Sequence, residues 1–181
     1  MDFGYFCEGA YFAADFVNTK SWLSGSERLG EPAAVRAFLA AHGLERRVAK
    51  ADIPKLQALR DRVRSVFTAD DEEQARNRIR ALLDDFPSQA KLADGSGGHT
   101  VVFEPSRHDV VSSIGANIAL GLAFFIGQHG TARLGICGAA DCADAFVDGS
   151  KNSSKRCCSS ECTRLENVRA FRARRRAGSE T

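Results

Sequence analysis

The sequence predicts an α+β fold, in which a mostly helical N-terminal domain with a few strands precedes a small C-terminal cysteine-rich module of treble-clef or ribbon type that ends in a basic helix. Two observations indicate the first part: several segments carry apolar residues at helical spacing, and short runs are rich in strand-forming residues. The third observation is that five of the chain's six cysteines lie between residues 137 and 162. With 181 residues and 44% hydrophobic content, the chain can bury a core of ordinary size.

The N-terminal domain is expected over residues 1–130 and the module over residues 131–181. Residues 9–19, GAYFAADFVNT, are aromatic and apolar, which favours a strand. A short helix should open at Pro32 and close at Gly43, because proline suits the first turn of a helix and glycine its end.

Two longer helices are expected next. Asp52 is the predicted N-cap of the first, and Asp70 with Glu73 forms the predicted cap of the second, which Pro87 should stop. Both segments repeat apolar residues every three or four positions, as a helix with one buried face does. These residues are Leu56, Leu59, Val63 and Phe67 in the first segment, and Ala75, Ile79, Leu82 and Phe86 in the second.

A turn (GSGGH, residues 95–99), a strand (residues 99–103) and an apolar helix should complete the N-terminal domain. The helix begins at Val110 and has no charged residue for 19 positions, a length that would also permit a membrane crossing. Its serines, asparagine and three glycines, and the lack of basic flanks, favour a buried core helix instead. Residues 132–137 (ARLGIC) then predict a short strand that leads into the cysteines.

The cysteines follow the pattern C-x4-C-x15-C-x3-C, which predicts one structural zinc ion held by Cys137, Cys142, Cys158 and Cys162. Two alternatives are reduced thiols in a loop-rich tail, and a redox pair, for which the usual C-x-x-C is missing. The N-terminus shows no secretory signal, and a cytoplasmic location keeps thiols reduced, which favours metal binding over disulfides. Four thiolates would leave zinc no open position for catalysis.

The adjacent cysteines Cys157 and Cys158 cannot both face one metal ion, because neighbouring side chains point in different directions. Cys158 is the favoured ligand, since it lies four positions before Cys162 and a turning chain brings such a pair onto one face. Thr163 with Glu166 matches a capping box, so a helix is expected to start just beyond the last ligand. Cys157 would pack against the module or remain a free thiol.

Charge is concentrated at the C-terminal end. Residues 151–176 contain nine basic and two acidic residues, whereas the first 150 residues contain 16 basic and 20 acidic ones. In the last helix, Leu165, Val168 and Phe171 should pack on the module while six arginines project around it. A solvated helix is one interpretation, and phosphate contact with DNA or RNA is the other.

From Cys137 to Arg174 the chain resembles the bacterial CGNR zinc-finger proteins, which join an N-terminal ABATE domain to a C-terminal zinc finger. The first cysteine pair is followed by the family's Phe-x-Asp-x-Ser-x-Asn stretch, and the last helix contains its Val-Arg-Ala-Phe-Arg-Ala-Arg run. The N-terminal DFVNT resembles the opening signature of the ABATE domain. The matching residues are Phe146, Asp148, Ser150 and Asn152, then Val168 to Arg174, and Asp15 to Thr19.

The chain departs from this family at two places. Thr163, Arg164 and Leu165 stand where the Gly-Asn-Arg that names the family should follow the last cysteine, and Cys157 occupies a position that is usually aromatic. The resemblance implies a stress-induced transcription regulator that binds DNA. A separate hypothesis makes the zinc module a protein-interaction or RNA-associated element without sequence-specific DNA binding. The expected nucleic-acid contacts are Lys155, Arg156, Arg164, Arg169, Arg172, Arg174, Arg175 and Arg176.

The N-terminal domain is expected to sense a signal or to mediate association, including association into a homo-oligomer. Asp15 and Asn18 are candidates to line a small-molecule pocket, although hydrogen bonding at a strand end is an alternative use for them. No nucleophile and base can be paired, and the four histidines are scattered, so an enzyme is not expected.

Overall fold

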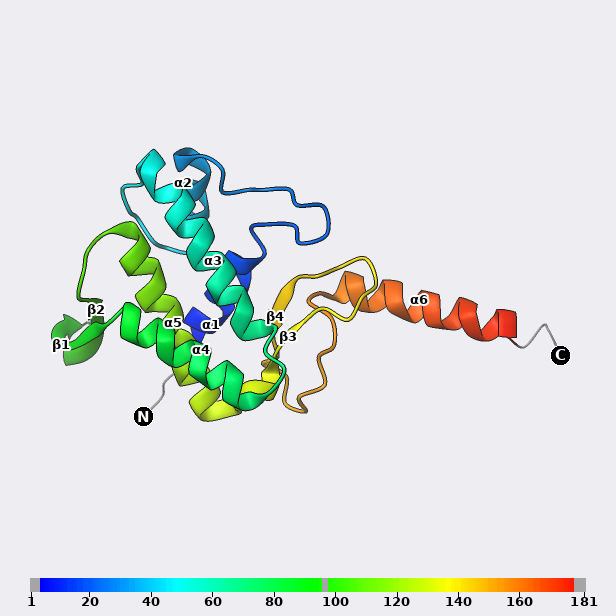
Figure 1. The fold of residues 1–181 in the computed structure, drawn as a ribbon. Helices are drawn as coiled ribbons and strands as arrows, with labels where there is room; N and C mark the ends of the chain where they lie inside the picture. The colour runs from blue at the N-terminus through cyan, green and yellow to red at the C-terminus, as the bar shows by residue number, and fades with distance from the viewer. Residues whose placement is uncertain (1–3, 96–97, 178–181) are drawn as a thin grey trace.

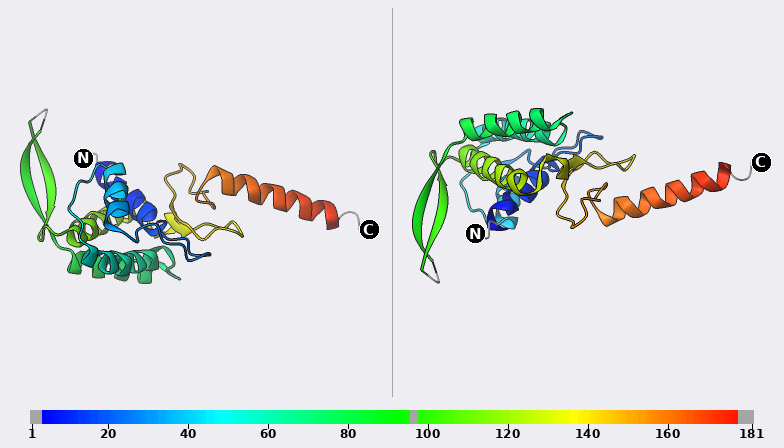
Figure 2. Two further views of the ribbon diagram at one scale, coloured as in Figure 1. Left: turned by 90° about the horizontal axis from the view of Figure 1, so that it is seen from above. Right: turned by 90° about the horizontal axis from the view of Figure 1, so that it is seen from below.

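The computed structural model describes residues 4–95 and 98–177. Helices dominate, and two small antiparallel sheets accompany them, which confirms the predicted α+β class. Four helices, α1, α3, α4 and α5, pack together as the main body (Figure 1). The hairpin β1–β2 lies at one end of this body, and the helix α6 projects from the other (Figure 2).

The strand predicted over residues 9–19 is wrong, because this segment belongs to helix α1 (Gly4–Val17). Its buried residues recur at helical rather than alternating positions, as Ala10, Ala13, Ala14 and Val17 show. Small residues also let α1 approach the central helix closely. A Cβ atom on Gly121 would lie 2.4 Å from the backbone of Gly9, so the two helices cross where neither residue has a side chain.

Helix α2 (Pro32–Ala41) and helix α3 (Ile53–Phe67) confirm two of the predicted helices. Gly43 follows α2 with a φ of 69°, the left-handed conformation that makes glycine suitable there. Asp52 is the N-cap residue of α3, as predicted, but its side chain makes a different hydrogen bond from the one expected of a cap. The Asp52 carboxylate accepts a hydrogen bond from the Ala49 backbone N–H across a single turn of 3-10 helix (Lys50–Asp52), and it caps no N–H of α3.

Helix α4 (Glu72–Asp85) confirms the third predicted helix and ends just before Pro87. Its cap is displaced by one residue from the prediction, since Asp71 rather than Asp70 accepts the hydrogen bond from Gln74 N–H, at 2.7 Å. The predicted apolar stripe faces the core, and Ala75, Ile79 and Leu82 are buried.

Strands β1 (Ser88–Gly95) and β2 (Gly98–Pro105) pair in an antiparallel hairpin. The strand over residues 99–103 is thereby confirmed, whereas β1 was not predicted. Its only large aliphatic residue, Leu92, is 72% exposed, so no alternation of buried and exposed residues marks it. The turn expected at residues 95–99 includes residues 96 and 97, which lie outside the described residues.

Helix α5 (Val110–His129) is the one described helix that is long and apolar enough to cross a membrane. It lies inside the body of helices, in contact with α1, α3 and α4, and its apolar residues are buried among them. The predicted core position of this helix is therefore confirmed. The buried residues of its predicted stripe are Ile114, Ile118, Leu122 and Phe125.

A second hairpin, β3 (Leu134–Ile136) with β4 (Ala145–Val147), follows α5 and a short 3-10 turn (Thr131–Arg133). The strand expected over residues 132–137 is confirmed. Ala145 and Val147 are buried in the same apolar core as the helices, and β4 contacts α1 and α3. The hairpin thus joins the cysteine-rich segment firmly to the helical body. The chain ends in α6 (Ser160–Ala177).

Candidate metal centre

The first cysteine pair is held by a tight loop between β3 and β4. Cys137 follows β3 directly, and its backbone N–H donates to the Asp144 carbonyl at 2.8 Å. Cys142 N–H donates to the Ala139 carbonyl at 3.0 Å, which closes a turn between the two cysteines. These bonds direct both side chains to the same side of the loop.

The second pair lies at the start of α6. Cys158 precedes this helix and Cys162 lies in its first turn, where the Ser159 hydroxyl accepts a hydrogen bond from Cys162 N–H at 3.2 Å. The helix therefore begins before Cys162, so the predicted capping box at Thr163 and Glu166 is wrong. Thr163 instead donates its hydroxyl to the Ser159 carbonyl, and the Glu166 carboxylate accepts from Ala140 N–H of the first loop.

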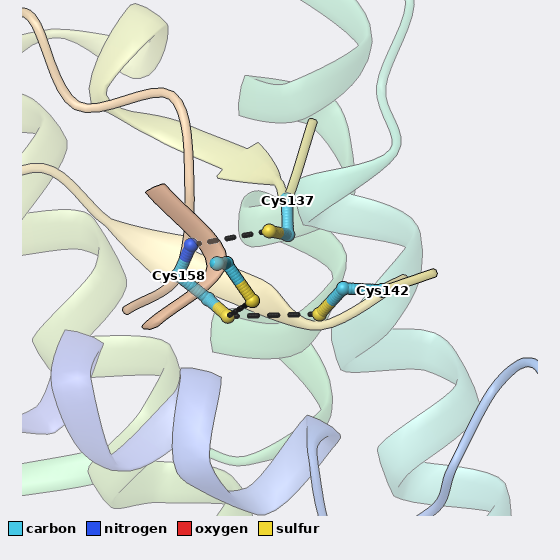
Figure 3. A group of neighbouring side chains, drawn as sticks. Cys137, Cys142 and Cys158 are labelled. Atoms are coloured by element: carbon cyan, nitrogen blue, oxygen red, sulfur yellow. Dashed lines mark hydrogen bonds between the residues drawn. The ribbon is translucent and has the colours of Figure 1, made fainter. Parts of the chain in front are cut away.

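The four sulfur atoms of Cys137, Cys142, Cys158 and Cys162 lie within 4.8 Å of one another. Cys158 Sγ is 3.6 Å from Cys142 Sγ and 3.7 Å from Cys162 Sγ (Figure 3). A tetrahedral zinc ion with Zn–S bonds of about 2.3 Å requires sulfurs about 3.8 Å apart. The donor set and its spacing therefore fit a zinc ion of the zinc-finger type.

Backbone N–H groups and burial act on these sulfurs in opposite directions. Burial raises the pKa of the Cys142 thiol to about 11, and it also raises the pKa of the Cys158 thiol. Burial acts on Cys137 too, but the N–H groups of Ala139 and Cys158 outweigh it and lower the pKa of Cys137. Burial removes the water that would otherwise stabilise negatively charged sulfur. A divalent cation among the sulfurs would supply a positive charge in place of that water and so stabilise all four thiolates.

Cys157 lies outside the group of four sulfurs. It is only 8% exposed and packs in a small apolar cluster with Cys137 and Ala139. Burial raises the pKa of its thiol, which favours the neutral form. Cys157 therefore packs as a small apolar residue against the first cysteine loop.

Asp148 orders the loop that connects the two cysteine pairs. Its carboxylate accepts hydrogen bonds from the N–H groups of Ser150, at 2.8 Å, and Lys155, at 2.9 Å. Hydrogen bonding from Ser150 lowers the pKa of this carboxyl group. Arg133 also stabilises this loop, because its guanidinium donates hydrogen bonds to the carbonyls of Asp148 and Ser150. The Phe-x-Asp-x-Ser-x-Asn stretch thus has a structural role.

Comparison with known families decides the identity of both parts. The family model of ABATE, described as "Putative stress-induced transcription regulator", matches residues 11–149. The chain belongs to the ABATE family. The model of the CGNR zinc finger matches residues 133–175, so the two matches share β3, β4 and the first cysteine loop. No curated protein matches the chain.

The ABATE signature DFVNT links the helical body to the zinc-finger loop. Asn18 Oδ1 accepts a hydrogen bond from Ala145 N–H at 2.7 Å, and Asn18 Nδ2 donates to the Ala145 carbonyl at 2.9 Å. Arg64 of α3 reaches the same loop and donates to the Ala143 carbonyl at 2.9 Å. The sequence did not predict a role for Arg64, because its hydrogen-bond partner lies 79 positions away in the chain and no nearby residue indicates the contact.

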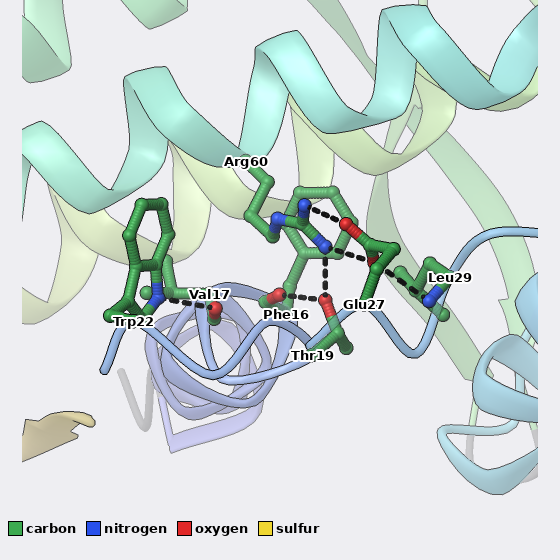
Figure 4. Close-up of polar contacts among 7 residues, drawn as sticks. All are labelled: Phe16, Val17, Thr19, Trp22, Glu27, Leu29 and Arg60. Atoms are coloured by element: carbon green, nitrogen blue, oxygen red, sulfur yellow. Dashed lines mark hydrogen bonds and ion pairs between the residues drawn. The ribbon is translucent and has the colours of Figure 1, made fainter. Parts of the chain in front are cut away.

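Thr19, the last residue of this signature, belongs to a buried polar cluster (Figure 4). Arg60 of α3 is 2% exposed and donates to the Thr19 hydroxyl at 3.1 Å and to both carboxylate oxygens of Glu27. The cluster fastens the loop after α1 to the body of the ABATE domain. Hydrogen bonding from Arg60 lowers the pKa of Glu27.

The structure places Asp15 and Asn18 apart from the larger cavity of the ABATE domain, whose lining includes neither residue. Asp15 is exposed, with its carboxylate 3.8 Å from His42 Nε2. Asn18 has both ends of its amide engaged by Ala145. Backbone hydrogen bonding, the alternative use considered for this pair, is therefore what the structure shows for Asn18.

Seven of the eight predicted nucleic-acid contacts fall into two groups. Three have local partners: Lys155 donates to the Val147 carbonyl, Arg164 pairs with Glu161, and Arg169 pairs with Glu166 and Asp141. The second group is exposed on the loop and on α6, and none of its members has an acidic partner among the described residues. They are Arg156, Arg172, Arg174 and Arg175.

The expectation that the apolar residues of α6 pack on the module is wrong. Leu165, Val168 and Phe171 are 42%, 37% and 54% exposed. Helix α6 instead contacts the first cysteine loop through Glu166 and Arg169, and the remainder projects into solvent (Figures 1 and 2). The zinc finger of this ABATE protein thus presents a helix with both apolar and basic side chains exposed.

Proposed function

We propose that this protein is a zinc-dependent transcription regulator whose zinc finger and basic helix bind DNA. The observation that carries the proposal is the position of α6. It starts within a cluster of four cysteine sulfurs, and beyond Arg169 it exposes Arg172, Arg174 and Arg175, which have no acidic partner among the described residues. Membership of a family described as transcription regulators supports the same conclusion.

The proposed metal is one structural zinc ion with Cys137, Cys142, Cys158 and Cys162 as ligands. Bound there, zinc would supply the cross-link between the first loop and the start of α6. The small apolar cluster around the cysteines contains few residues beyond the cysteines themselves, so the metal is expected to provide most of the local folding energy. Four thiolate ligands leave no position for a substrate, which supports a regulator rather than an enzyme.

Electrostatic attraction to phosphates supports DNA as the partner. Arg172, Arg174 and Arg175 lie on the part of α6 farthest from the body, and Arg156 lies on the loop before Cys157. Lys155, Arg164 and Arg169 already have partners in the protein, so we expect them to contribute less to phosphate contact. Arg176 completes the proposed set.

The helical domain is proposed to sense a signal or to mediate association, over residues 1–130, with the DNA-binding role assigned to residues 131–181. The bonds from Asn18 and Arg64 to the first cysteine loop give the two parts a direct physical connection. A regulator of this kind acts in the cytoplasm, where thiols stay reduced and chromosomal DNA is accessible.

A salt titration of DNA binding tests the proposal. Fluorescence anisotropy would follow the zinc-loaded protein and duplex DNA between about 50 and 200 mM salt, a range over which phosphate contacts change affinity strongly. The double variant Arg172→Ala/Arg174→Ala should reduce the slope of log K against log salt by about 2. The matched variant Arg36→Ala/Arg47→Ala removes two exposed arginines from the helical domain and should leave the slope unchanged. Equal slopes for both variants, or no binding at the lowest salt, would refute DNA binding by α6.

Exposed apolar residues on α6 favour a second candidate function. In it, the zinc-stabilised module binds another protein or associates with RNA. Leu165, Val168 and Phe171 form a surface that phosphate contact alone does not require. Val168→Glu should abolish self-association, measured by sedimentation velocity, if this surface joins two copies. Tighter binding of single-stranded RNA than of duplex DNA in the anisotropy assay would favour the RNA-associated role.

A further inference from the structure

The hairpin β1–β2 does not lie flat against the helices. It encloses with them a cavity of about 530 Å³, bounded by β2, α5, the segment after α2, and Gly9 of α1. Figure 2 shows the hairpin as a long ribbon at the edge of the helical body. A volume of this size is typical of small-molecule sites, which commonly lie between secondary-structure elements of a domain.

The cavity has mostly apolar walls and one charged side chain. Leu44 and Leu120 contribute aliphatic surface from the helical body, and Val102 and Phe103 contribute surface from β2, while the buried Leu39 and Ile114 lie behind this surface. Arg46 is the only ionisable residue in the lining; it is exposed, and no carboxylate pairs with it among the described residues. The cavity therefore combines mostly apolar walls with one solvent-exposed positive charge that no carboxylate balances.

Two polar groups orient Arg46 as the candidate head-group site. Arg46 Nε lies 3.4 Å from the Ser113 hydroxyl, and Nη1 donates to the Glu45 carbonyl at 2.8 Å, which orients the guanidinium. Ser113 also lines the cavity, so its hydroxyl and the arginine lie on the same wall.

We propose that this cavity binds an amphipathic monocarboxylate, with the carboxylate at Arg46 and Ser113 and the apolar part among the aliphatic side chains. An arginine fork matches the planar geometry of a carboxylate. A single arginine balances one negative charge, whereas a phosphate monoester would carry close to two. The idea that this ligand is the signal rests on the proposed regulatory function. Binding of the ligand does not, because it is measured in the absence of DNA.

Decanoate is a suitable probe, and decanol is the uncharged control of the same chain length. Isothermal titration calorimetry on the zinc-loaded full chain should show one saturable site for decanoate and binding of decanol at least about tenfold weaker. Equal affinities for the two compounds would overturn the proposal, as would the lack of saturable decanoate binding up to about 1 mM, the weak end of specific recognition.

Variants locate the site. Arg46→Gln should weaken decanoate binding at least about tenfold, because it removes the charge but keeps a hydrogen-bond donor. Arg47→Gln, a change at an exposed neighbour that is absent from the lining, should stay within about twofold. Thr100→Trp, on an exposed strand position of the lining, should block binding by filling the cavity. Unchanged affinity in Arg46→Gln and Thr100→Trp would overturn the assignment.

The DNA assay on the same variants separates this proposal from the regulatory one. Arg46 lines the cavity beside β2, and the hairpin β1–β2 lies at the opposite end of the helical body from α6 (Figure 2). Arg46→Gln should therefore retain the DNA affinity of the unaltered protein. DNA binding without decanoate binding would refute only the carboxylate site. Decanoate binding without DNA binding would refute only the regulator.

Discussion

The Asn18 side chain and the Ala145 backbone form a paired hydrogen bond, at 2.7 and 2.9 Å, between residues 127 positions apart in the chain. One amide side chain here satisfies both the N–H and the C=O of a strand residue, in the way that a neighbouring strand would. This contact is the most direct connection between the ABATE signature and the loop that holds the first two cysteines.

Replacing Asn18 with alanine should lower the free energy of unfolding by about 2 kcal/mol, because two partly buried backbone groups lose their partners. Asn18→Asp should not restore the stability, because it keeps the acceptor but sets a carboxylate oxygen against the Ala145 carbonyl oxygen. Urea denaturation of the zinc-loaded protein measures the difference. The exposed Asn77, whose side chain accepts a hydrogen bond from Arg80, provides the control, and Asn77→Ala should change stability by less than about 0.5 kcal/mol. A loss of the same small size for Asn18→Ala would show that the paired bond contributes little.

Adjacent cysteines give a sharp test of the ligand set. Cys158→Ser should remove bound zinc, because its sulfur lies within 3.7 Å of two of the other sulfurs. Cys157→Ser should retain one zinc ion per chain, since Cys157 lies outside the cluster. Metal content after dialysis, measured by mass spectrometry, distinguishes the two. Zinc loss in Cys157→Ser with retention in Cys158→Ser would reverse the assignment.

Arg60, which is buried, pairs with the partly exposed Glu27, and this pair predicts a particular pH dependence. Hydrogen bonding from Arg60 lowers the pKa of Glu27 below the usual 4.5, so its ionised form stabilises the folded state above that pH. Glu27→Gln should cost about 1–2 kcal/mol at pH 7, because the buried Arg60 loses a charge-assisted hydrogen bond while solvent screens part of the pair. The gap between the two proteins should shrink as the pH falls below about 4.5, where Glu27 begins to be protonated.

Glu104→Gln is the matched control for this pH experiment. Glu104 also pairs with a cation, Lys91, but both side chains are well exposed. The cost at pH 7 should therefore be clearly smaller than that of Glu27→Gln, because solvent screens an exposed pair. Chemical denaturation at several pH values checks both variants. A gap for Glu27→Gln that stays constant down to pH 4 would mean that ionisation of Glu27 does not stabilise the fold.

Two glycines of α5 should respond to alanine with opposite signs. Gly121→Ala places a Cβ atom 2.4 Å from the backbone of Gly9, so α1 and α5 must separate, at a cost of about 2–3 kcal/mol. Gly127→Ala meets no atom within 4 Å and should stabilise the helix by about 0.5–1 kcal/mol. Thermal unfolding of the two variants gives the comparison. Similar shifts in both would contradict the close crossing of α1 and α5.

Much of the fold follows from local patterns. Apolar spacing predicts α3, α4 and α5, and Pro32 and Gly43 predict the ends of α2. The error at α1 has a physical cause: its alanines and glycines are buried by close helix contact, a feature of tertiary packing that composition does not reveal. The cap of α4 was placed one residue too early because Asp70 and Asp71 are adjacent and either could accept the first hydrogen bond.

The candidate site divides in the same way. The spacing of the cysteines predicts which sulfurs converge, because short loops restrict where each pair can point. The contacts of Asn18 and Arg64 with residues 143 and 145 were not predicted, since they join segments that only the folded body brings together. Likewise, the exposure of Phe171 depends on the direction in which α6 leaves the cysteine loop, which no local pattern determines.

The packing of β4 has a consequence for building chimeras of this protein. Ala145 and Val147 complete the apolar core of the helices, although they lie beyond the first cysteine pair. A hybrid in which the zinc finger is exchanged at residue 131 would also replace these core residues of the recipient protein with those of the donor. A junction after residue 149 would preserve that apolar core. The recipient would then keep the first cysteine pair, and the foreign segment would supply the second pair and the terminal helix. Recombination between relatives is therefore expected to succeed at the later position, with a shared first loop and an exchangeable terminal helix.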